Sequence, residues 1–376
     1  VEEFEDSSRE LTRLNLFVGR ISAFLNPVTY VLINIATVIL IDRAGIQVNM
    51  GNMQQGEVVA LYNYMLQIIV ELIKLASLII TLNKSMACAD RVAGILAVKS
   101  SMTYVNDEKC QEEKNQNHTP AVKFDHVTFT YAGAGAPSLK NISFQAMPGE
   151  TIGIIGGTGS GKSTLVSLIP RFYDPQDGQV YMDGENVTEY TRKSLGEKVG
   201  VVQQRSVLFQ GSIRDNLKWG DENATDEDIW KAIEIAQAKE VVEGKPGKLD
   251  FQLEQNGRNL SGGQKQRLTI ARALVKKPEI LILDDSASAL DFATDAALRK
   301  AIRGLEGKMT TFLVSQRVAG IKQADKILVL GNGELAGQGT HEELMKNCEV
   351  YQEIYYSQFP EEKLREKINY DEKGEA

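Results

Sequence analysis

The stretch TIGIIGGTGSGKSTLVSLI, residues 151–169, decides the fold. It predicts a buried strand, a glycine-rich loop and the start of a helix, in the order that a phosphate-binding loop requires. Gly156, Gly159 and Gly161 let backbone N–H groups face phosphate oxygens. Lys162 supplies a positive charge for the outer phosphates, and Ser163 supplies a hydroxyl for Mg²⁺. The residues expected to contact the phosphates are Gly156, Gly157, Thr158, Gly159, Ser160, Gly161, Lys162, Ser163 and Thr164.

A second stretch, ILILDDSASALD, residues 280–291, carries two neighbouring carboxylates. Its aliphatic residues predict a buried strand that ends at Asp284. A carboxylate at that place completes a Mg²⁺ site beside a phosphate loop, so we expect Asp284 to act together with Ser163. Asp285 follows directly. Whether this second carboxylate reaches far enough to act on water decides whether the chain hydrolyses a nucleotide by itself.

Length and composition indicate two structural units, because 376 residues exceed what one hydrophobic core usually supports. Long apolar runs dominate residues 17–82, whereas the remainder has the mixed charge and regular glycines of an α/β domain. The formal net charge of -8 argues against nucleic acid as a partner, since phosphate backbones select basic surfaces. Cys88, Cys110 and Cys348 form no CxxC pair, which favours a reducing compartment over a disulfide framework or a zinc site.

The apolar runs predict two membrane spans, at residues 18–41 and 58–82. A pair of long buried helices in a soluble protein is the alternative. The connector between the runs is short and poor in Lys and Arg, so the positive-inside bias predicts that both outer ends are cytoplasmic. The basic residues that flank the runs on those outer sides are Arg9, Arg13, Arg20, Lys84 and Arg91.

Three residues interrupt the apolar spans. Pro27 removes a backbone donor, so we expect it to loosen the first helix. Glu71 and Lys74 stand three residues apart on one helix face, where they form a local ion pair or contact a transported substrate.

The order of segments predicts four regions. The helical region is followed by a polar segment without hydrophobic periodicity, by the α/β domain and by a charge-rich end. The chain has no initiator Met, so we expect it to be part of a longer protein. The predicted regions are residues 1–100 for the helices, 101–120 for the linker, 121–360 for the domain and 361–376 for the tail.

One further motif, NLSGGQKQRLTIARAL at residues 259–274, separates this sequence from other chains with a phosphate loop. Ser261, Gly262 and Gly263 stand at the start of a predicted helix, where a hydroxyl and a positive helix end can face an anion. The same residues in isolation would indicate an ordinary helix cap. Between the phosphate loop and Asp284, the motif resembles the signature of ATP-binding cassette (ABC) transporters, which includes Gln264.

The resemblance implies roles for further residues. Tyr131, at the end of FDHVTFTY, stands where the family places an aromatic ring against adenine. Gln204 stands where the family has a glutamine that senses Mg²⁺ and contacts the membrane domain, although Gln203 replaces the proline often found before it. Ser288 and Asp291 match the loop that crosses to the opposite subunit. The resemblance therefore implies ATP and Mg²⁺ as cofactors, with Ser163, Gln204 and Asp284 around the metal.

Two positions depart from the family pattern. Asp285 replaces the usual Glu, so its carboxylate is one methylene shorter; by itself this leaves a tolerated acidic exchange open. Gln316, in TTFLVSQRVAG, replaces the switch histidine and cannot carry an imidazolium charge. His118, His126 and His341 all lie elsewhere in the sequence. Altered hydrolysis positions beside intact binding positions indicate selective loss of turnover with ATP binding retained.

In the family two ATP-binding domains pair head to tail, so each ATP lies between the phosphate loop of one chain and the signature of the other. The sequence resembles the degenerate-site half of heterodimeric bacterial multidrug exporters: two spans, the C-terminal part of a six-helix exporter domain, followed by an α/β P-loop NTPase domain. The resemblance implies a plasma- or inner-membrane location with a cytoplasmic ATP-binding domain, contact with membrane lipid, a drug- or lipid-like exported substrate, and a second half-transporter with intact Glu and His.

Other functions remain open at this point. A homodimeric exporter would use Asp285 as a slow base, and a regulatory or channel-like subunit would bind ATP without pumping. The two spans argue against a soluble ABC ATPase of DNA repair or translation, and importer ATPases usually lack fused spans.

Overall fold

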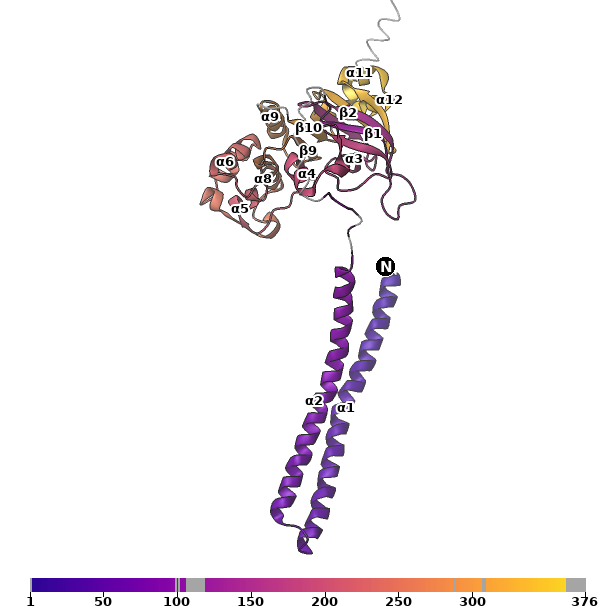
Figure 1. Cartoon of the computed structure of the whole chain (residues 1–376), viewed down its shortest axis with the longest axis vertical. Coiled ribbons are helices and arrows are strands. Elements are labelled where there is room, and N and C mark those ends of the chain that lie inside the picture. The colour runs from indigo at the N-terminus through magenta and orange to yellow at the C-terminus, as the bar shows by residue number, and fades with distance from the viewer. Residues whose placement is uncertain are drawn as a thin grey trace, which may run out of the picture. The chain divides into compact units, whose positions relative to one another are not determined.

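The structure is a computed structural model that describes residues 2–98, 100, 102–105, 119–286, 289–305 and 309–362. The chain divides into two compact units, Val1–Ser100 and Ser101–Ala376. Figure 1 shows two long helices in the first unit and a layered arrangement of helices and sheets in the second.

The first unit consists of α1 (Glu2–Asn49) and α2 (Gln55–Leu96). Both helices include a stretch long and apolar enough to cross a membrane: Pro27–Asn49, with a mean hydropathy of 1.7, and Gln55–Leu96, with 2.1. These stretches are 6% and 0% buried, so they are not core helices of this chain. The helices contain the predicted spans and extend beyond them at both ends.

The residues that interrupt the spans sit inside regular helix. The helical backbone of α1 runs unbroken past Pro27, so the expected loosening does not end the helix. Lys74 Nζ donates to Glu71 Oε1 at 2.8 Å, which is the local ion pair among the two expected roles.

A six-stranded sheet forms the centre of the second unit, with the strand order β12-β11-β3-β10-β9-β6. All neighbours are parallel except β11 and β12. Every residue of β3 and β10 is buried, as expected for parallel strands covered on both faces. The strands are β3 (Thr151–Gly156), β6 (Val199–Val202), β9 (Ile280–Asp284), β10 (Thr310–Val314), β11 (Lys326–Gly331) and β12 (Glu334–Gly339).

Two hydrophobic clusters cover the two faces of this sheet. Along β9, Ile280 and Ile282 point into one cluster while Leu281 and Leu283 point into the other, because successive strand side chains alternate. One cluster includes β1, β2 and β4 of the antiparallel sheet β2-β1-β4-β5, where the rings of Phe124 and Phe144 stack with their centroids 4.6 Å apart. Those strands are β1 (Val122–Phe129), β2 (Leu139–Ala146), β4 (Asp177–Met182) and β5 (Glu185–Asn186).

The other cluster contains most of the helices. A helical region around α5, α6 and α8 packs together, and α12 closes the cluster at the C-terminal side through buried Tyr351 and Tyr355 (Figure 1). The remaining elements are α3 (Lys162–Leu168), η1 (Val187–Glu189), α4 (Arg192–Lys198), β7 (Gly211–Ser212), α5 (Ile213–Lys218), α6 (Asp226–Ile235), α7 (Lys239–Glu243), η2 (Lys248–Asp250), β8 (Gln252–Leu253), η3 (Gln255–Gly257), α8 (Gly262–Val275), α9 (Phe292–Arg303), α10 (Val318–Ile321), α11 (His341–Asn347) and α12 (Glu349–Gln358).

Candidate functional site

A cavity of about 360 Å³ lies at the carboxyl ends of β3, β9 and β10. This edge of a parallel sheet is where ligands bind in open α/β folds, because loops and helix N-termini converge there. The cavity brings most of the predicted residues together: its lining includes Tyr131, Thr158, Gly159, Ser160, Gly161, Lys162, Ser163, Thr164, Gln204, Asp284, Asp285 and Gln316.

The loop between β3 and α3 requires its glycines. Gly161 has φ 97, and a Cβ there would lie 2.8 Å from the Ser138 carbonyl oxygen and 2.8 Å from Leu139 Cδ2. A Cβ on Gly156 would lie 2.2 Å from the Leu330 carbonyl oxygen. These distances are shorter than side-chain carbons adopt in proteins, so both positions require glycine. Without side chains there, the backbone N–H groups of the loop can approach a ligand closely.

Lys162 lies inside the loop and is 8% exposed. Its Nζ donates to the carbonyl oxygens of Gly156 at 2.9 Å and Gly157 at 2.7 Å. Burial lowers the pKa of Lys162, and the carboxylates of Asp285 and Asp284 oppose that shift. The ammonium therefore stands at the centre of the loop, where a phosphate group would meet it.

Ser160 gives an independent indication of an anionic ligand. Its Oγ is buried and has no hydrogen-bond partner among the described residues. A buried hydroxyl without a partner costs free energy, so such groups usually mark a place where a ligand or water binds. A phosphate oxygen would accept this hydrogen bond.

Ser163 and Asp284 form an oxygen-rich pair at the end of β9. Ser163 Oγ donates to Asp284 Oδ1 at 3.0 Å. Burial raises the pKa of Asp284, and the Ser163 hydrogen bond opposes that shift. A hydroxyl and a carboxylate are the ligand types that Mg²⁺ prefers, so this pair fits the expected metal.

Asp285 is held differently. Gln204 Nε2 donates to Asp285 Oδ2 at 3.1 Å, and the Asp285 backbone N–H donates to the Val314 carbonyl at 3.0 Å. Burial raises the pKa of Asp285, while the charges of Lys162 and Arg317 oppose that shift. The carboxylate therefore lines the cavity but is engaged by the amide of Gln204.

Gln316 belongs to a segment that follows β10 and ends at the first residue of α10, residues 315–318, which we call the switch loop. Arg317 N–H donates to Ser315 Oγ at 2.9 Å, which folds the loop tightly. The Gln316 side chain lines the cavity and makes no hydrogen bond within the described part of the chain. Its amide is thus available to a ligand.

Tyr131 borders the cavity as part of an aromatic group. Its ring meets Phe129 at 4.8 Å and Tyr173 at 5.2 Å, both edge to face. Its hydroxyl lies 3.1 Å from Thr164 Oγ1. The Tyr131 side chain thus joins the end of β1 to the first turn of α3, and it remains partly exposed to a planar ligand.

Residues 139–288 match the family model of the ABC transporter. The chain is 38% identical over 360 residues to an uncharacterized ABC transporter ATP-binding protein of Mycobacterium bovis, an alignment that covers 95% of this chain and 61% of the relative. Residues 139–288 therefore form an ABC transporter domain.

Two further similarities are to proteins of the exporter type. An ATP-dependent lipid A-core flippase of Chromobacterium violaceum is 32% identical, over 95% of this chain and 60% of the flippase. A bacterial Atm1-family ABC exporter with ATP bound matches with a TM-score of 0.73 and 30% identity, over 89% of this chain and 58% of that exporter. The fusion of a helical segment to an ABC domain is therefore of the exporter type, and the chain spans about three-fifths of the relatives' length.

The family signature does not line the cavity. Ser261 caps α8: its Oγ accepts from the Gln264 N–H at 3.4 Å, and Gln264 Oε1 accepts from the Ser261 N–H at 3.1 Å. A Cβ on Gly262 would meet nothing within 4 Å, whereas one on Gly263 would lie 3.1 Å from the Ala289 carbonyl. Ser261 therefore caps α8, and the space beside Gly262 is not filled by other described residues.

Asp291, in the loop that the family uses between subunits, caps α9. Its side chain accepts from the Thr294 N–H at 2.9 Å, and this bond lowers the pKa of Asp291. Ser288 lies outside the described residues.

Neither of the two histidines that the structure describes lines the cavity. His126 Nδ1 lies 2.7 Å from Asn141 Oδ1, and His341 Nδ1 lies 2.8 Å from Tyr351 Oη. His118 lies outside the described residues. Gln316 is therefore the side chain that the described part of the site offers in place of the family's switch histidine.

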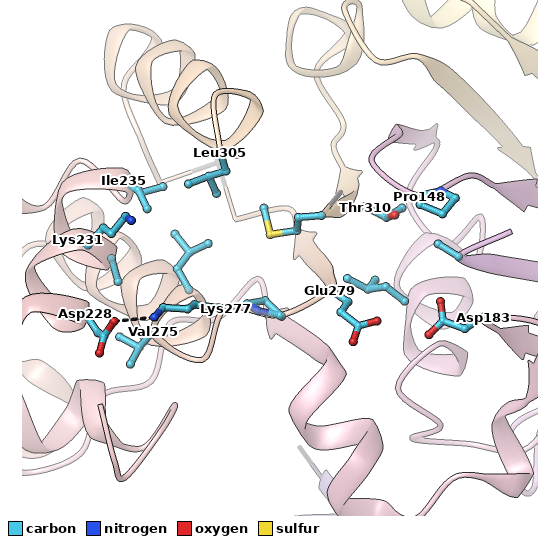
Figure 2. A pocket seen from close by; sticks show the side chains of 16 residues that line it. Pro148, Asp183, Asp228, Lys231, Ile235, Val275, Lys277, Glu279, Leu305 and Thr310 are labelled. Carbon is cyan, nitrogen blue, oxygen red and sulfur yellow. Dashed lines mark hydrogen bonds and ion pairs between the residues drawn. The ribbon is translucent and has the colours of Figure 1, made fainter. Parts of the chain in front are cut away.

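A second cavity of about 450 Å³ lies at the opposite edge of the sheet, where β9 and β10 begin (Figure 2). Lys231 and Ile235 of α6 line it on one side, and Thr310 lines it on the other. Lys277 Nζ donates to Asp228 Oδ1 at 2.6 Å across its rim. Of the predicted site residues that the structure describes, none lines this cavity.

Sequence reasoning missed one contact to the site. Gln358, the last residue of α12, hydrogen-bonds to the backbone of the switch loop. It is separated by 42 residues from Gln316, and no local pattern indicates such a pairing.

Proposed function

We propose that this chain belongs to a subunit of an ABC exporter that binds Mg·ATP and couples ATP binding and hydrolysis to outward transport. Three observations support ATP binding: the thin glycine loop, the ammonium of Lys162 held at its centre, and the unpartnered hydroxyl of Ser160. Ser163 and Asp284 would hold Mg²⁺, with Gln204 at the cavity edge. The metal, when bound, supplies positive charge against the phosphates.

We further propose that the chain's own ATP site is degenerate. The observation that supports this proposal is the hydrogen bond from Gln204 to Asp285. A short carboxylate engaged by an amide donor is a poor general base, because misplacement by about 1 Å can cost roughly 10²-fold in rate. Gln316 can donate a hydrogen bond to a γ-phosphate but supplies no charge. The site therefore holds ATP more readily than it cleaves it.

The intact signature gives the chain its second role. Ser261 and Gly262, at the start of α8, would face the ATP of a second half-transporter that carries Glu and His. ATP bound between the two chains favours the closed dimer, and the membrane helices respond to that shift in population. Asp291 and Ser288 would contribute to the same contact.

The turnover of the purified full-length chain tests the degenerate site. Without a partner it should bind Mg·ATP and hydrolyse it slowly. Co-purified with a half-transporter that carries Glu and His, it should show rapid hydrolysis that is lost when the partner's Glu is replaced. Brisk hydrolysis by the chain alone would contradict the heterodimer.

A matched pair of variants locates the active site. Ser261→Asp keeps the helix cap but places a negative charge toward the partner's ATP, so it should abolish rapid hydrolysis by the pair. Asp285→Asn should leave most of that hydrolysis intact. The opposite order of effects would assign the turnover to this chain's own site.

A homodimeric exporter is the second candidate. The observation that favours it is that one chain contains both a complete phosphate loop and a capped signature helix. In that case Asp285→Asn would abolish the slow turnover of the chain alone, whereas the heterodimer proposal predicts that this turnover falls by less than about 10-fold.

We also propose a membrane location with the ATP-binding unit in the cytoplasm and a drug- or lipid-like substrate. The apolar, exposed surfaces of α1 and α2 support the location, and the similarity to a lipid A-core flippase supports the substrate class. Vesicles that contain both halves test it: ATP-dependent movement of a labelled lipid or drug is expected. ATP binding without any movement would favour a regulatory subunit.

A further inference from the structure

The last residue of α12 holds the switch loop by two hydrogen bonds. Gln358 Nε2 donates to the Gln316 carbonyl oxygen at 2.7 Å, and Gln358 Oε1 accepts from the Val318 N–H at 2.9 Å. A carbonyl needs a donor and an N–H needs an acceptor, so only one orientation of the amide satisfies both. We call this pair of bonds the Gln358 clasp.

The clasp supplies an acceptor for a backbone N–H of the switch loop. Val318 is the first residue of α10, so its N–H has no acceptor within the helix. Gln358 provides that acceptor from another helix. The two bonds span the loop from Gln316 to Val318.

The helix that carries Gln358 is firmly anchored. Tyr351 and Tyr355 of α12 are 0% and 4% exposed and pack in the same hydrophobic cluster as Val318. The clasp thus ties the loop backbone to the core. On its other side, Ser315 N–H donates to the Ile154 carbonyl of β3 at 3.0 Å. The backbone of Gln316 is therefore fixed from both directions.

We propose that Gln358 is a positioning residue for Gln316: the clasp keeps the Gln316 amide on the nucleotide cavity and thereby sets the preference of the site for ATP over ADP. Gln358 does not line the cavity, so it acts only through the loop. This inference rests on the proposed ATP site. It adds to that site a residue of α12 that is separated from Gln316 by 42 residues in the sequence.

Two substitutions separate the two bonds. Gln358→Met keeps the length of the side chain and removes both bonds. Gln358→Glu keeps an acceptor for the Val318 N–H but has no donor for the Gln316 carbonyl at neutral pH. Gln352→Met is the matched control, because Gln352 Nε2 donates at 2.8 Å to the Met345 carbonyl, away from the switch loop.

The first measurement is hydrogen–deuterium exchange of the full-length chain. Gln358→Met should speed exchange in the peptide that contains residues 316–320, whereas Gln358→Glu should keep the Val318 amide protected and Gln352→Met should change nothing there. Unchanged exchange in Gln358→Met overturns the clasp, whatever the nucleotide does.

The second measurement is the affinity for ATP and for ADP. Loss of one hydrogen bond to the γ-phosphate should weaken ATP binding by about 3- to 10-fold and leave ADP binding unchanged. Both Gln358 variants should show this loss, and Gln352→Met should not. Equal weakening of both nucleotides would contradict positioning, because it indicates general damage to the fold.

A double substitution shows whether the effect passes through Gln316. In a Gln316→Ala background, Gln358→Met should have no further effect on the ratio of ATP to ADP affinity. A full additional loss there would overturn the proposal. If the unsubstituted chain binds neither nucleotide, the proposed function fails, and the exchange experiment still decides whether the clasp exists.

Discussion

Asp285 adopts a backbone conformation that is uncommon outside glycine. Its φ is 45, in the left-handed region where Asp and Asn are tolerated better than longer side chains. The backbone conformation at this position therefore suits aspartate better than a longer side chain. The side chain and its conformation belong together.

Asp285→Asn tests how much this carboxylate contributes. Asn tolerates the same φ and its Oδ1 can still accept from Gln204, so the site should keep its structure. We expect ATP affinity to be retained and the chain's own turnover to fall by less than about 10-fold, whereas loss of a true general base costs at least roughly 10²-fold. Steady-state hydrolysis by the chain alone measures it.

Gly161→Ala tests the thinness of the phosphate loop. The added Cβ would approach Ser138 and Leu139 at 2.8 Å in a left-handed backbone, so we expect a lower melting temperature and weaker ATP binding. Gly157→Ala is the control, because a Cβ there meets nothing within 4 Å. A melting temperature of Gly161→Ala equal to that of Gly157→Ala would contradict this account.

Much of the candidate site could be predicted from the identity and spacing of its residues in the sequence. Lys162 and Asp284 are separated by many residues, but Lys162 comes after the buried strand β3 and Asp284 ends the buried strand β9, and the parallel strands of one sheet end at the same edge. That rule predicts their meeting at the cavity. The hydrogen bond between Gln204 and Asp285 could not be predicted, because it depends on the path of two loops rather than on any periodic pattern.

At the scale of elements, α11 and α12 meet through a histidine. His341, the first residue of α11, lies with its Nδ1 2.8 Å from Tyr351 Oη and its ring 5.4 Å from the Tyr355 ring. Burial lowers the pKa of His341 below its usual 6.5, and the charge of Lys322 adds to the shift. The neutral ring is therefore the form that fits between the two helices.

This shift predicts a pH dependence of stability. Between the folded pKa and 6.5 the unfolded chain binds more protons than the folded chain, so stability is complete above 6.5 and falls as the pH drops below it. His341→Gln should flatten this part of the profile in thermal unfolding. His126→Asn is the control, since His126 is exposed and Asn tolerates its φ of 51. Identical profiles for both variants would contradict the assignment.

The elements differ in how well a sequence specifies them. The strands around Ile154 and Ile282 are short aliphatic runs whose length and flanking turns identify them. By contrast, α12 combines polar and aromatic residues without strong periodicity, and its pairing with the switch loop joins residues far apart in the chain. Contacts of that kind are specified by the whole fold.

At the scale of the whole molecule, the two units differ in composition, and both hydrophobic clusters lie in the second unit. The hydrophobic clusters of the second unit draw on residues from Tyr104 onward. A fragment of residues 101–376 should therefore fold as a soluble protein and bind ATP with the affinity of the full chain. A soluble fragment that binds no ATP would show that the helices contribute to the ATP site, and an insoluble fragment would show that the second unit does not fold by itself.

The membrane proposal has its own test. In a chain that lacks the native cysteines, Asn52→Cys places a thiol in the exposed turn between α1 and α2, and Cys88 can be restored near the end of α2. An impermeant maleimide added to intact cells should label position 52 but not position 88. The reverse labelling, or labelling of both, would contradict cytoplasmic outer ends.

The cap at the start of α8 also affects how this chain would bind ATP held by a partner subunit. Ser261 Oγ uses a lone pair to accept from the Gln264 N–H, so its own hydrogen remains free to donate elsewhere. The first turn of the helix is thus preorganised by bonds within this chain. A neighbouring nucleotide would find the hydroxyl already oriented, and the ordering entropy of that loop would not have to be lost on association.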